Sequence, residues 1–171
     1  MYILGDIGNS ETKIFLVNSK NKIIKNTNFP TKKINDKILN SKFKTLIGDF
    51  KKVKKLLFCS VVPKSFYLIK KFLSNKTKIR CYEVKNLKLN SLLNIKVDFK
   101  QVGSDRLTNA ISLLNNIDNF IILDFGTATT FDVVVKKNYN GGVIAPGIKI
   151  SLNTLSDKAT LFPKINLKKI K

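Results

Sequence analysis

The alternation of apolar and polar residues at the start of the chain predicts three short strands, at about residues 2–7, 12–18 and 22–27. The polar run from Asn18 to Asn21 supplies a tight turn between the second and third strands, so the three form a meander. Apolar residues near helical spacing then predict a helix from Thr31 to Ile47. This order of elements is typical of the beginning of an α/β domain.

The middle of the chain continues to alternate between strands and helices. A buried strand is predicted from Leu56 to Val62, and Pro63 suits the first turn of a helix that runs through Leu73. A further strand is predicted from Ile79 to Val84. Residues 85–101 are polar and irregular, and a helix is predicted from Val102 to Ile117.

The last part of the chain predicts a second hairpin, a strand and a helix. The hairpin strands are Phe120 to Asp124 and Thr129 to Val135. A strand follows from Gly142 to Ala145, and Pro146 or Gly147 opens a helix that runs to about Asp157. The whole pattern predicts an α/β fold.

The first and second hairpins repeat one pattern: a strand, an Asp, one apolar residue, a Gly, small polar residues and a second strand. Asp6 and Gly8 occupy these places in the first copy, and Asp124 and Gly126 in the second. A Gly between two strands permits a positive φ and exposes N–H groups that can bind an anion, while the Asp can hold a metal ion. An isolated Asp-x-Gly is a turn signal. Its recurrence favours two facing hairpins that grip the phosphates of one nucleotide.

The spacing of the repeat limits the architecture. Asp6 and Asp124 lie 118 positions apart, and 47 residues follow Asp124 in a chain of 171. An equal second unit would need far more than those residues. We therefore expect either a drastically shortened second half or a fragment of a longer protein.

The net charge of +21 suggests nucleic acid or an anionic membrane as a partner. However, Arg80 and Arg106 are the only arginines among 32 basic residues, and the lysines are spread along the chain. Sequence-specific nucleic-acid surfaces favour Arg for its bidentate fork and aromatic residues for stacking. We therefore interpret the charge as a solvated lysine surface, with no nucleic-acid partner.

Several residue types are absent or isolated. There is no His, which excludes His-based catalysis. Cys59 and Cys81 have no spacing for zinc or redox chemistry and are interpreted as small buried hydrophobes in a reducing compartment. No signal peptide is visible and no apolar run approaches about 18 residues, so we expect a cytoplasmic protein without a membrane span.

The segment from Gly103 to Arg106 is the next candidate for chemistry. Gly103 and Ser104 could cap a helix and place Asp105 in its first turn, where the helix dipole already favours an acidic residue. Arg106 in so lysine-rich a chain suggests a planar, bidentate task. A carboxylate that orients a hydroxyl and an Arg that holds an acidic substrate would complete a small-molecule kinase site.

Five segments in order give the chain a close resemblance to the type III pantothenate kinases. They are Asp6–Ser10, Ser60–Pro63, Gly103–Arg106, Asp124–Thr130 and Gly141–Ile148. The resemblance implies the ribonuclease H-like/actin-like ATPase fold of the acetate and sugar kinase, Hsp70 and actin superfamily, with a mixed sheet flanked by helices. On this basis residues 1–117 are a complete first unit and residues 118–171 a truncated second unit. The implied reaction is ATP-dependent phosphorylation of pantothenate, the first step of coenzyme A synthesis.

The resemblance also implies roles for individual residues. Asp105 is the base that accepts the proton of the pantothenate hydroxyl. Pantothenate is bound by Gly103, Ser104, Asp105 and Arg106, of which Arg106 suits its carboxylate. ATP is bound by Asp6, Ile7, Gly8, Asn9, Ser10, Glu11, Thr12 and Lys13 of the first phosphate loop and by Thr127. Asp6 lies near Mg²⁺, and Asp124 holds a monovalent cation, potassium or ammonium.

The cation at Asp124 also has a physical argument. Asp124 ends a predicted buried strand, where an uncompensated carboxylate is costly to desolvate, and a bound cation would offset its charge. The alternative is that Asp124 caps the turn through its own backbone.

The chain departs from the family pattern in places. Ser104 stands where the family commonly has Ala, a change expected to be harmless. Residues 95–101 lack the Tyr and Pro that the family often has before Gly103. Family members continue beyond the last helix, and they are dimers whose pocket uses both subunits.

Two other functions remain open. A non-catalytic nucleotide- or partner-binding remnant would bind ATP without turnover. A lysine-rich nucleic-acid-binding protein would show salt-sensitive binding to DNA or RNA.

Overall fold

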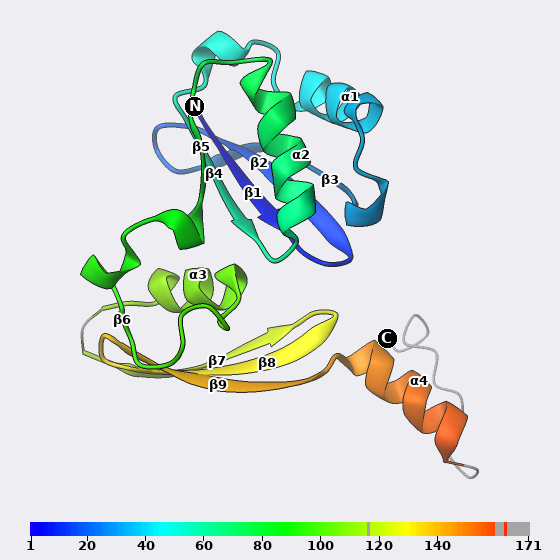
Figure 1. Cartoon of the computed structure of the whole chain (residues 1–171), viewed down its shortest axis with the longest axis vertical. Helices are drawn as coiled ribbons and strands as arrows, with labels where there is room; N and C mark the ends of the chain where they lie inside the picture. The colour runs from blue at the N-terminus through cyan, green and yellow to red at the C-terminus, as the bar shows by residue number, and fades with distance from the viewer. Residues whose placement is uncertain (116, 160–162, 164–171) are drawn as a thin grey trace. The chain divides into compact units, whose positions relative to one another are not determined.

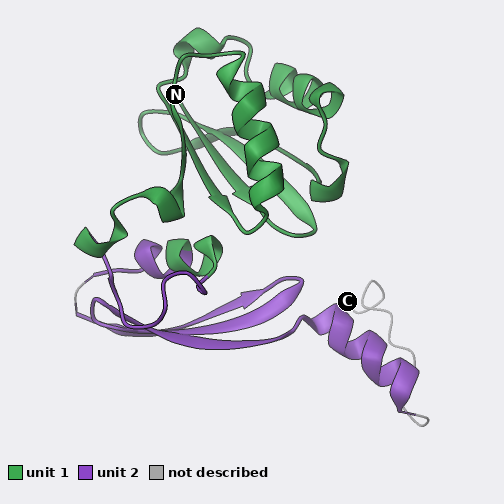
Figure 2. Ribbon diagram, in the orientation of Figure 1, with its two compact units in different colours: residues 1–91, 103–108 green, residues 92–102, 109–171 purple. Residues whose placement is uncertain are grey.

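A computed structural model describes residues 1–115, 117–159 and 163, which form two compact units (Figure 2). The first unit comprises residues 1–91 and 103–108, and the second comprises residues 92–102 and 109–171. The predicted boundary between actin-like units at residue 117 comes from the repeat in the sequence. The compact units are defined by contacts and do not test this boundary, which stays a prediction.

The first unit is built on a five-stranded mixed sheet of order β3-β2-β1-β4-β5 (Figure 1). Its strands are β1 (Tyr2–Ile7), β2 (Glu11–Val17), β3 (Ile23–Pro30), β4 (Lys55–Ser60) and β5 (Cys81–Glu83). The first three form the predicted antiparallel meander, and β4 and β5 add to β1 in parallel. The turn lies where the polar run predicted it, since the Asn18 side chain accepts from the N–H groups of Lys20 and Lys22.

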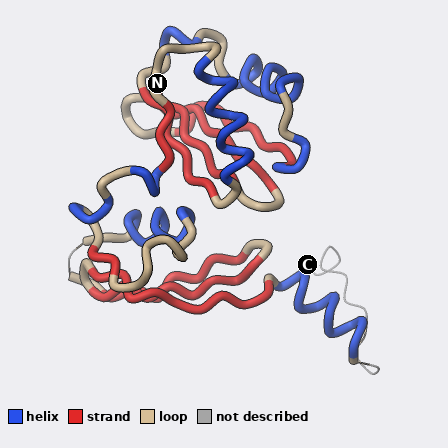
Figure 3. The backbone as a smooth tube through the Cα atoms, in the orientation of Figure 1, coloured by secondary structure: helices blue, strands red, loops and turns tan. Residues whose placement is uncertain are grey.

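The helices α1 (Asp36–Leu46) and α2 (Pro63–Ser74) pack on one face of this sheet (Figure 3). Alternate residues of the strands, such as Ile3 and Ile14, point into one core with the apolar stripes of both helices. The rings of Phe43 and Phe72 meet there with centroids 5.4 Å apart. The core thereby fixes the carboxyl ends of β1 and β4, where the candidate site residues lie.

The second unit is built on a four-stranded sheet of order β6-β9-β8-β7. Its strands are β6 (Asn94–Ile95), β7 (Asn119–Phe125), β8 (Ala128–Val135) and β9 (Asn138–Pro146), and α4 (Ile148–Lys158) follows. The strands β7 and β8 form the predicted second hairpin. The helix α3 (Ser104–Ser112) contributes its first residues to the first unit and its last residues to the second.

The two faces of the second sheet differ in burial. Ile122, Val134 and Tyr139 are buried on one face. The strand register places an apolar set on the other face, and this set is exposed: Ile121, Leu123, Phe125, Phe131 and Val143. An exposed apolar surface of this kind is unusual for a soluble monomer.

Several predicted boundaries are wrong. The helix predicted from Thr31 to Ile47 is a 3₁₀ turn, η1 (Thr31–Lys33), followed by α1, because Asn35 caps α1 by accepting from the Ile38 N–H at 2.9 Å. The helix predicted to reach Ile117 ends at Ser112, where Asn115 instead accepts from the N–H groups of Ile117 and Asp118.

Other elements differ in length or were not predicted. The strand β5 is shorter than predicted. The strand β9 is longer than predicted, because it continues through Gly141 and Gly142, where its register with β8 shifts after Asp132. The irregular segment from residue 85 contains the short strand β6. The remaining 3₁₀ turns are η2 (Phe50–Lys52), η3 (Val84–Asn86) and η4 (Leu89–Ser91).

Candidate active site

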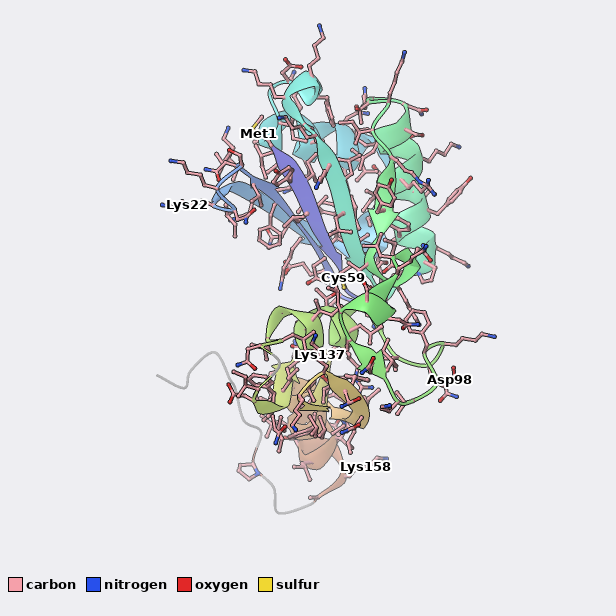
Figure 4. All side chains as sticks on the ribbon, turned by 90° about the vertical axis from the view of Figure 1, so that its left-hand side faces the viewer. Met1, Lys22, Cys59, Asp98, Lys137 and Lys158 are labelled. Atoms are coloured by element: carbon pink, nitrogen blue, oxygen red, sulfur yellow. The ribbon has the colours of Figure 1, made fainter. Side chains whose placement is uncertain are left out.

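The first predicted phosphate loop joins β1 to β2 at the carboxyl end of β1. Asp6 pairs with Lys13 of β2 on one side and with Cys59 of β4 on the other. Cys59 can be followed in Figure 4 at the carboxyl end of β4. It is half-buried and not fully buried as predicted, while Cys81 is buried. Because β1 and β4 are parallel, their ends bring the Asp6 carboxylate and the Cys59 thiol to one edge of the sheet.

Thr31 holds this loop in place. Its hydroxyl donates to the Gly8 carbonyl at 2.7 Å, and its N–H donates to the Ser10 carbonyl at 3.0 Å. The buried hydroxyl of Thr12 completes the contact at 3.0 Å from that of Thr31. The Gly8 N–H donates to the Glu11 carbonyl at 3.0 Å. No local pattern pointed to Thr31, because its contact with the loop spans 23 positions of the chain.

The glycines of the two loops do not use the positive φ that glycine permits. Neither Gly8 nor Gly126 has one. Among the described glycines the left-handed value belongs to Gly141, with φ of 86°. The loops are therefore closed by hydrogen bonds within each hairpin and not by left-handed glycines.

The first turn of α3 carries the predicted base. Asp105 is half-buried, and its Oδ1 accepts from the Arg106 N–H at 2.8 Å. A Cβ on Gly103 would lie 2.3 Å from that same oxygen. Gly103 therefore leaves the room into which the Asp105 carboxylate folds. Arg106 is buried, with 8% of its surface exposed.

The surroundings of Cys59 show which carboxylates lie together in the first unit. Burial raises the pKa of the Cys59 thiol to about 11, the nearby hydroxyls of Ser104 and Thr108 act to lower the pKa, and the charges of Asp6 and Asp105 act to raise it. Asp6 and Asp105 therefore both lie close enough to this thiol for their charges to act on it. Within this unit the structure brings together the two predicted acidic residues, although 99 positions separate them in sequence.

The second predicted phosphate loop joins β7 to β8. Asp124 lies near this loop and is exposed. The expectation that it is a buried carboxylate whose desolvation a cation must offset is therefore wrong. Its Oδ2 accepts from the Asn109 side-chain amide at 3.0 Å. Asn109, on α3, is a second supporting residue that the sequence did not reveal. It orients the carboxylate and leaves it open to solvent and to a cation.

The backbone of this second loop is packed closely. The Gly126 N–H donates to the Ala128 carbonyl at 2.9 Å, and the Gly147 N–H donates to the Thr127 carbonyl at 3.2 Å. A Cβ on Gly147 would lie 2.3 Å from the Gly126 carbonyl oxygen and 2.6 Å from that of Thr127. Only a glycine allows the start of α4 to approach the loop this closely.

The residues that could hold metal ions are single carboxylates. In the described part of the chain no three acidic, Cys or His side chains gather into a cluster that could hold a metal. Asp6 and Asp124 each offer carboxylate oxygens, the kind of ligand that hard cations prefer. No helix in the described ranges is long and apolar enough to span a membrane.

Comparison with known proteins extends this picture to the whole chain. A protein of Pelagibacter ubique named type III pantothenate kinase is 63% identical over 169 residues, which cover 99% of this chain and 68% of that protein. A solved structure of a conserved putative Baf family transcriptional activator from Campylobacter jejuni has a TM-score of 0.56 at 20% identity, with 99% of this chain and 65% of that one covered. The chain thus spans about two thirds of the length of these relatives.

A second solved structure bears on the fold alone. A putative 2-dehydro-3-deoxygalactonokinase from Sinorhizobium meliloti has a TM-score of 0.53 at 8% identity, with 94% of this chain and 59% of that one covered. The predicted actin-like fold of the sugar kinases is confirmed. The sequence profile described as type III pantothenate kinase matches residues 2–171. With that match and the 63% identical relative, the chain belongs to the type III pantothenate kinase family.

Proposed function

We propose that this chain transfers the γ-phosphoryl group of ATP to the primary hydroxyl of pantothenate and so forms 4′-phosphopantothenate, the first step of coenzyme A synthesis. Membership of the family supports the reaction. The observation that carries it in the structure is that Asp6 and Asp105, 99 positions apart in sequence, both lie near enough to Cys59 for their charges to raise its pKa. A metal-binding carboxylate and a hydroxyl-orienting carboxylate in one neighbourhood suit phosphoryl transfer, which depends on positioning and charge neutralisation.

Asp105 is proposed as the residue that accepts the proton of the attacking hydroxyl. The Arg106 N–H holds one carboxylate oxygen at 2.8 Å, which fixes the direction of the group. Orienting the hydroxyl is most of its task, because the proton leaves late in a loose transition state. Gly103 to Arg106 are proposed to bind pantothenate, with the Arg106 guanidinium suited to the substrate carboxylate.

The two hairpin loops are proposed to bind ATP. The first supplies residues 6–13, whose backbone Thr31 holds in place. The second supplies Thr127, which is exposed next to the tightly packed Gly126 and Gly147. Backbone N–H groups in such turns attract phosphate oxygens. Residues 1–117 and 118–171 are proposed as the complete and partial actin-like units that carry these loops.

Two cations are proposed to assist. Mg²⁺ near Asp6 would neutralise charge on the phosphates of ATP. Potassium or ammonium at Asp124 fits an exposed carboxylate that Asn109 orients. Turnover should then fall when sodium replaces potassium, and Asp124→Asn should be slow in both salts. We further propose a cytoplasmic homodimer, as the family resemblance implies.

One observation favours a second candidate, a remnant that binds nucleotide or a partner without catalysis. One face of the second sheet is apolar and exposed, as a surface that binds a partner would be. A remnant would bind ATP and release no ADP. The same experiment separates it from the kinase.

The test is a coupled assay of ADP release with and without pantothenate, together with direct measurement of ATP binding. Asp105→Asn should lower pantothenate-dependent turnover by about 10²-fold or more and leave ATP affinity nearly intact, because the hydroxyl loses its base. Asp36→Asn, an exposed acid in the first turn of α1, is the matched control and should behave as the wild type. Equal turnover in Asp105→Asn would remove the assigned role. ATP binding without turnover in the wild type would establish the remnant.

A further inference from the structure

Glu83 makes a buried contact with the helix that carries Asp105. It ends β5 and has 8% of its surface exposed. The Ser104 hydroxyl donates to its Oε1 at 2.5 Å, and Ser104, the first residue of α3, is 2% exposed. A hydrogen bond to a charged acceptor is short and strong, and a buried carboxylate without one would be costly. The contact therefore ties the first turn of α3 to the sheet.

The turn held in this way is the one that sets the direction of Asp105. Ser104 precedes Asp105 directly, and its carbonyl accepts from the Thr108 hydroxyl at 2.8 Å. The Gly103 carbonyl accepts from the Leu107 N–H at the longer distance of 3.3 Å. A rotation at Ser104 would move the Asp105 carboxylate, which lies over Gly103. The side-chain contact with Glu83 opposes that rotation.

We propose that Glu83 is a positioning residue that fixes the Asp105 carboxylate through Ser104. The inference rests on the proposed role of Asp105 as the base. An apolar side chain would fill a buried position at lower cost than a carboxylate, so a purely structural role gives no reason for an acid here. The proposal is therefore at odds with the expectation that a small-for-small change at Ser104 is harmless.

Hydrogen exchange of the intact chain tests the anchoring step without any need for activity. Glu83→Ala and Ser104→Ala should each accelerate exchange in the peptide that covers residues 103–108 by about tenfold or more, because the local opening loses a charged hydrogen bond. Exchange in α2 should stay at the wild-type rate. Glu83→Gln keeps an acceptor oxygen and should restore most of the protection. Ser112→Ala makes the same chemical change at the other end of α3 and is the control.

Steady-state kinetics test the positioning step. Ser104→Ala should lower kcat by about tenfold or more, since small displacements of a catalytic group are costly, and should leave the KM for ATP within about twofold. Glu83→Gln should recover most of the kcat. The proposal is overturned if these variants accelerate hydrogen exchange in α2 as much as in α3. It is also overturned if exchange in α3 accelerates while kcat stays at the wild-type value. If the wild type has no turnover, the proposed function fails, and the exchange experiment still decides whether Glu83 anchors the turn. If Glu83→Ala does not fold, Ser104→Ala carries both tests.

Discussion

Cys59 is the residue whose chemistry reports most directly on the candidate site. Burial is the main reason that its pKa rises to about 11, and the hydrogen bonds and carboxylates around it all belong to candidate site residues or their neighbours. A thiol with this pKa is almost entirely protonated near neutral pH and reacts slowly. Its titration therefore measures the charge that surrounds it.

Asp105→Asn should lower the pKa of Cys59. The substitution removes a negative charge that disfavours the thiolate, while desolvation still keeps the pKa above its ordinary value of 9.0. The pH dependence of alkylation by iodoacetamide measures this in a Cys81→Ala background. The rate at a fixed pH below 9 should rise.

The control for this titration is Asp36→Asn, which removes an equal charge from the exposed start of α1. It should leave the alkylation profile unchanged. If Asp105→Asn also leaves the profile unchanged, the Asp105 carboxylate does not face the thiol, and its assignment to the site loses its geometric support.

At the scale of elements, the second phosphate loop depends on its contact with the start of α4. Gly147→Ala should destabilise the second unit by roughly 1–3 kcal/mol and weaken ATP binding, because the new methyl group meets the backbone carbonyls of Gly126 and Thr127. Chemical denaturation and ATP titration measure the two effects.

Gly48→Ala provides the comparison, since a Cβ at Gly48 would have nothing within 4 Å. It should leave both quantities close to the wild type. Equal behaviour of Gly147→Ala and Gly48→Ala would show that α4 does not shape the loop.

Elements defined by local pattern were predicted well from the sequence, and contacts between distant segments were not. The hairpins follow from alternation around Asp6 and Asp124, and α2 follows from Pro63. Boundaries failed where a polar side chain competes with the helix for backbone groups, as Asn115 does after α3.

The same distinction between local patterns and long-range contacts applies to the candidate site. Motif spacing made Asp105 and both loops candidates for the site. Thr31, Glu83 and Asn109 act on these through hydrogen bonds that span 15 to 23 positions, and no periodicity encodes such pairs. The half-burial of Cys59 was missed for the same reason, because its neighbours come from β1 and α3.

At the scale of the whole molecule, the net positive charge suggests a nucleic-acid partner, and the kind of basic residue that supplies the charge argues against one. Lysines such as Lys22, at the tip of the turn between β2 and β3, carry their ammonium groups out into solvent (Figure 4). They give a net charge of +21 with two arginines among 32 basic residues. A scattered set of strongly hydrated point charges attracts anions without selecting among them.

Duplex DNA should therefore bind weakly and without sequence preference, with a dissociation constant of about 10⁻⁴–10⁻⁶ M at physiological salt. Fluorescence anisotropy with two unrelated duplexes measures both affinity and preference. ATP affinity, measured alongside, should fall only modestly over the same salt range. Sub-micromolar binding that distinguishes the two duplexes would instead make nucleic acid a partner.

The scarcity of arginine also gives the native fold a simple proteolytic readout. A protease that cleaves only after arginine has two possible sites in the chain, the exposed Arg80 before β5 and the buried Arg106 within α3. Cleavage after Arg80 would proceed on the folded protein, whereas cleavage after Arg106 requires α3 to unwind. The delay between the two cleavages therefore measures how often the turn that holds Asp105 opens. Any ligand that stabilises the closed turn should lengthen that delay.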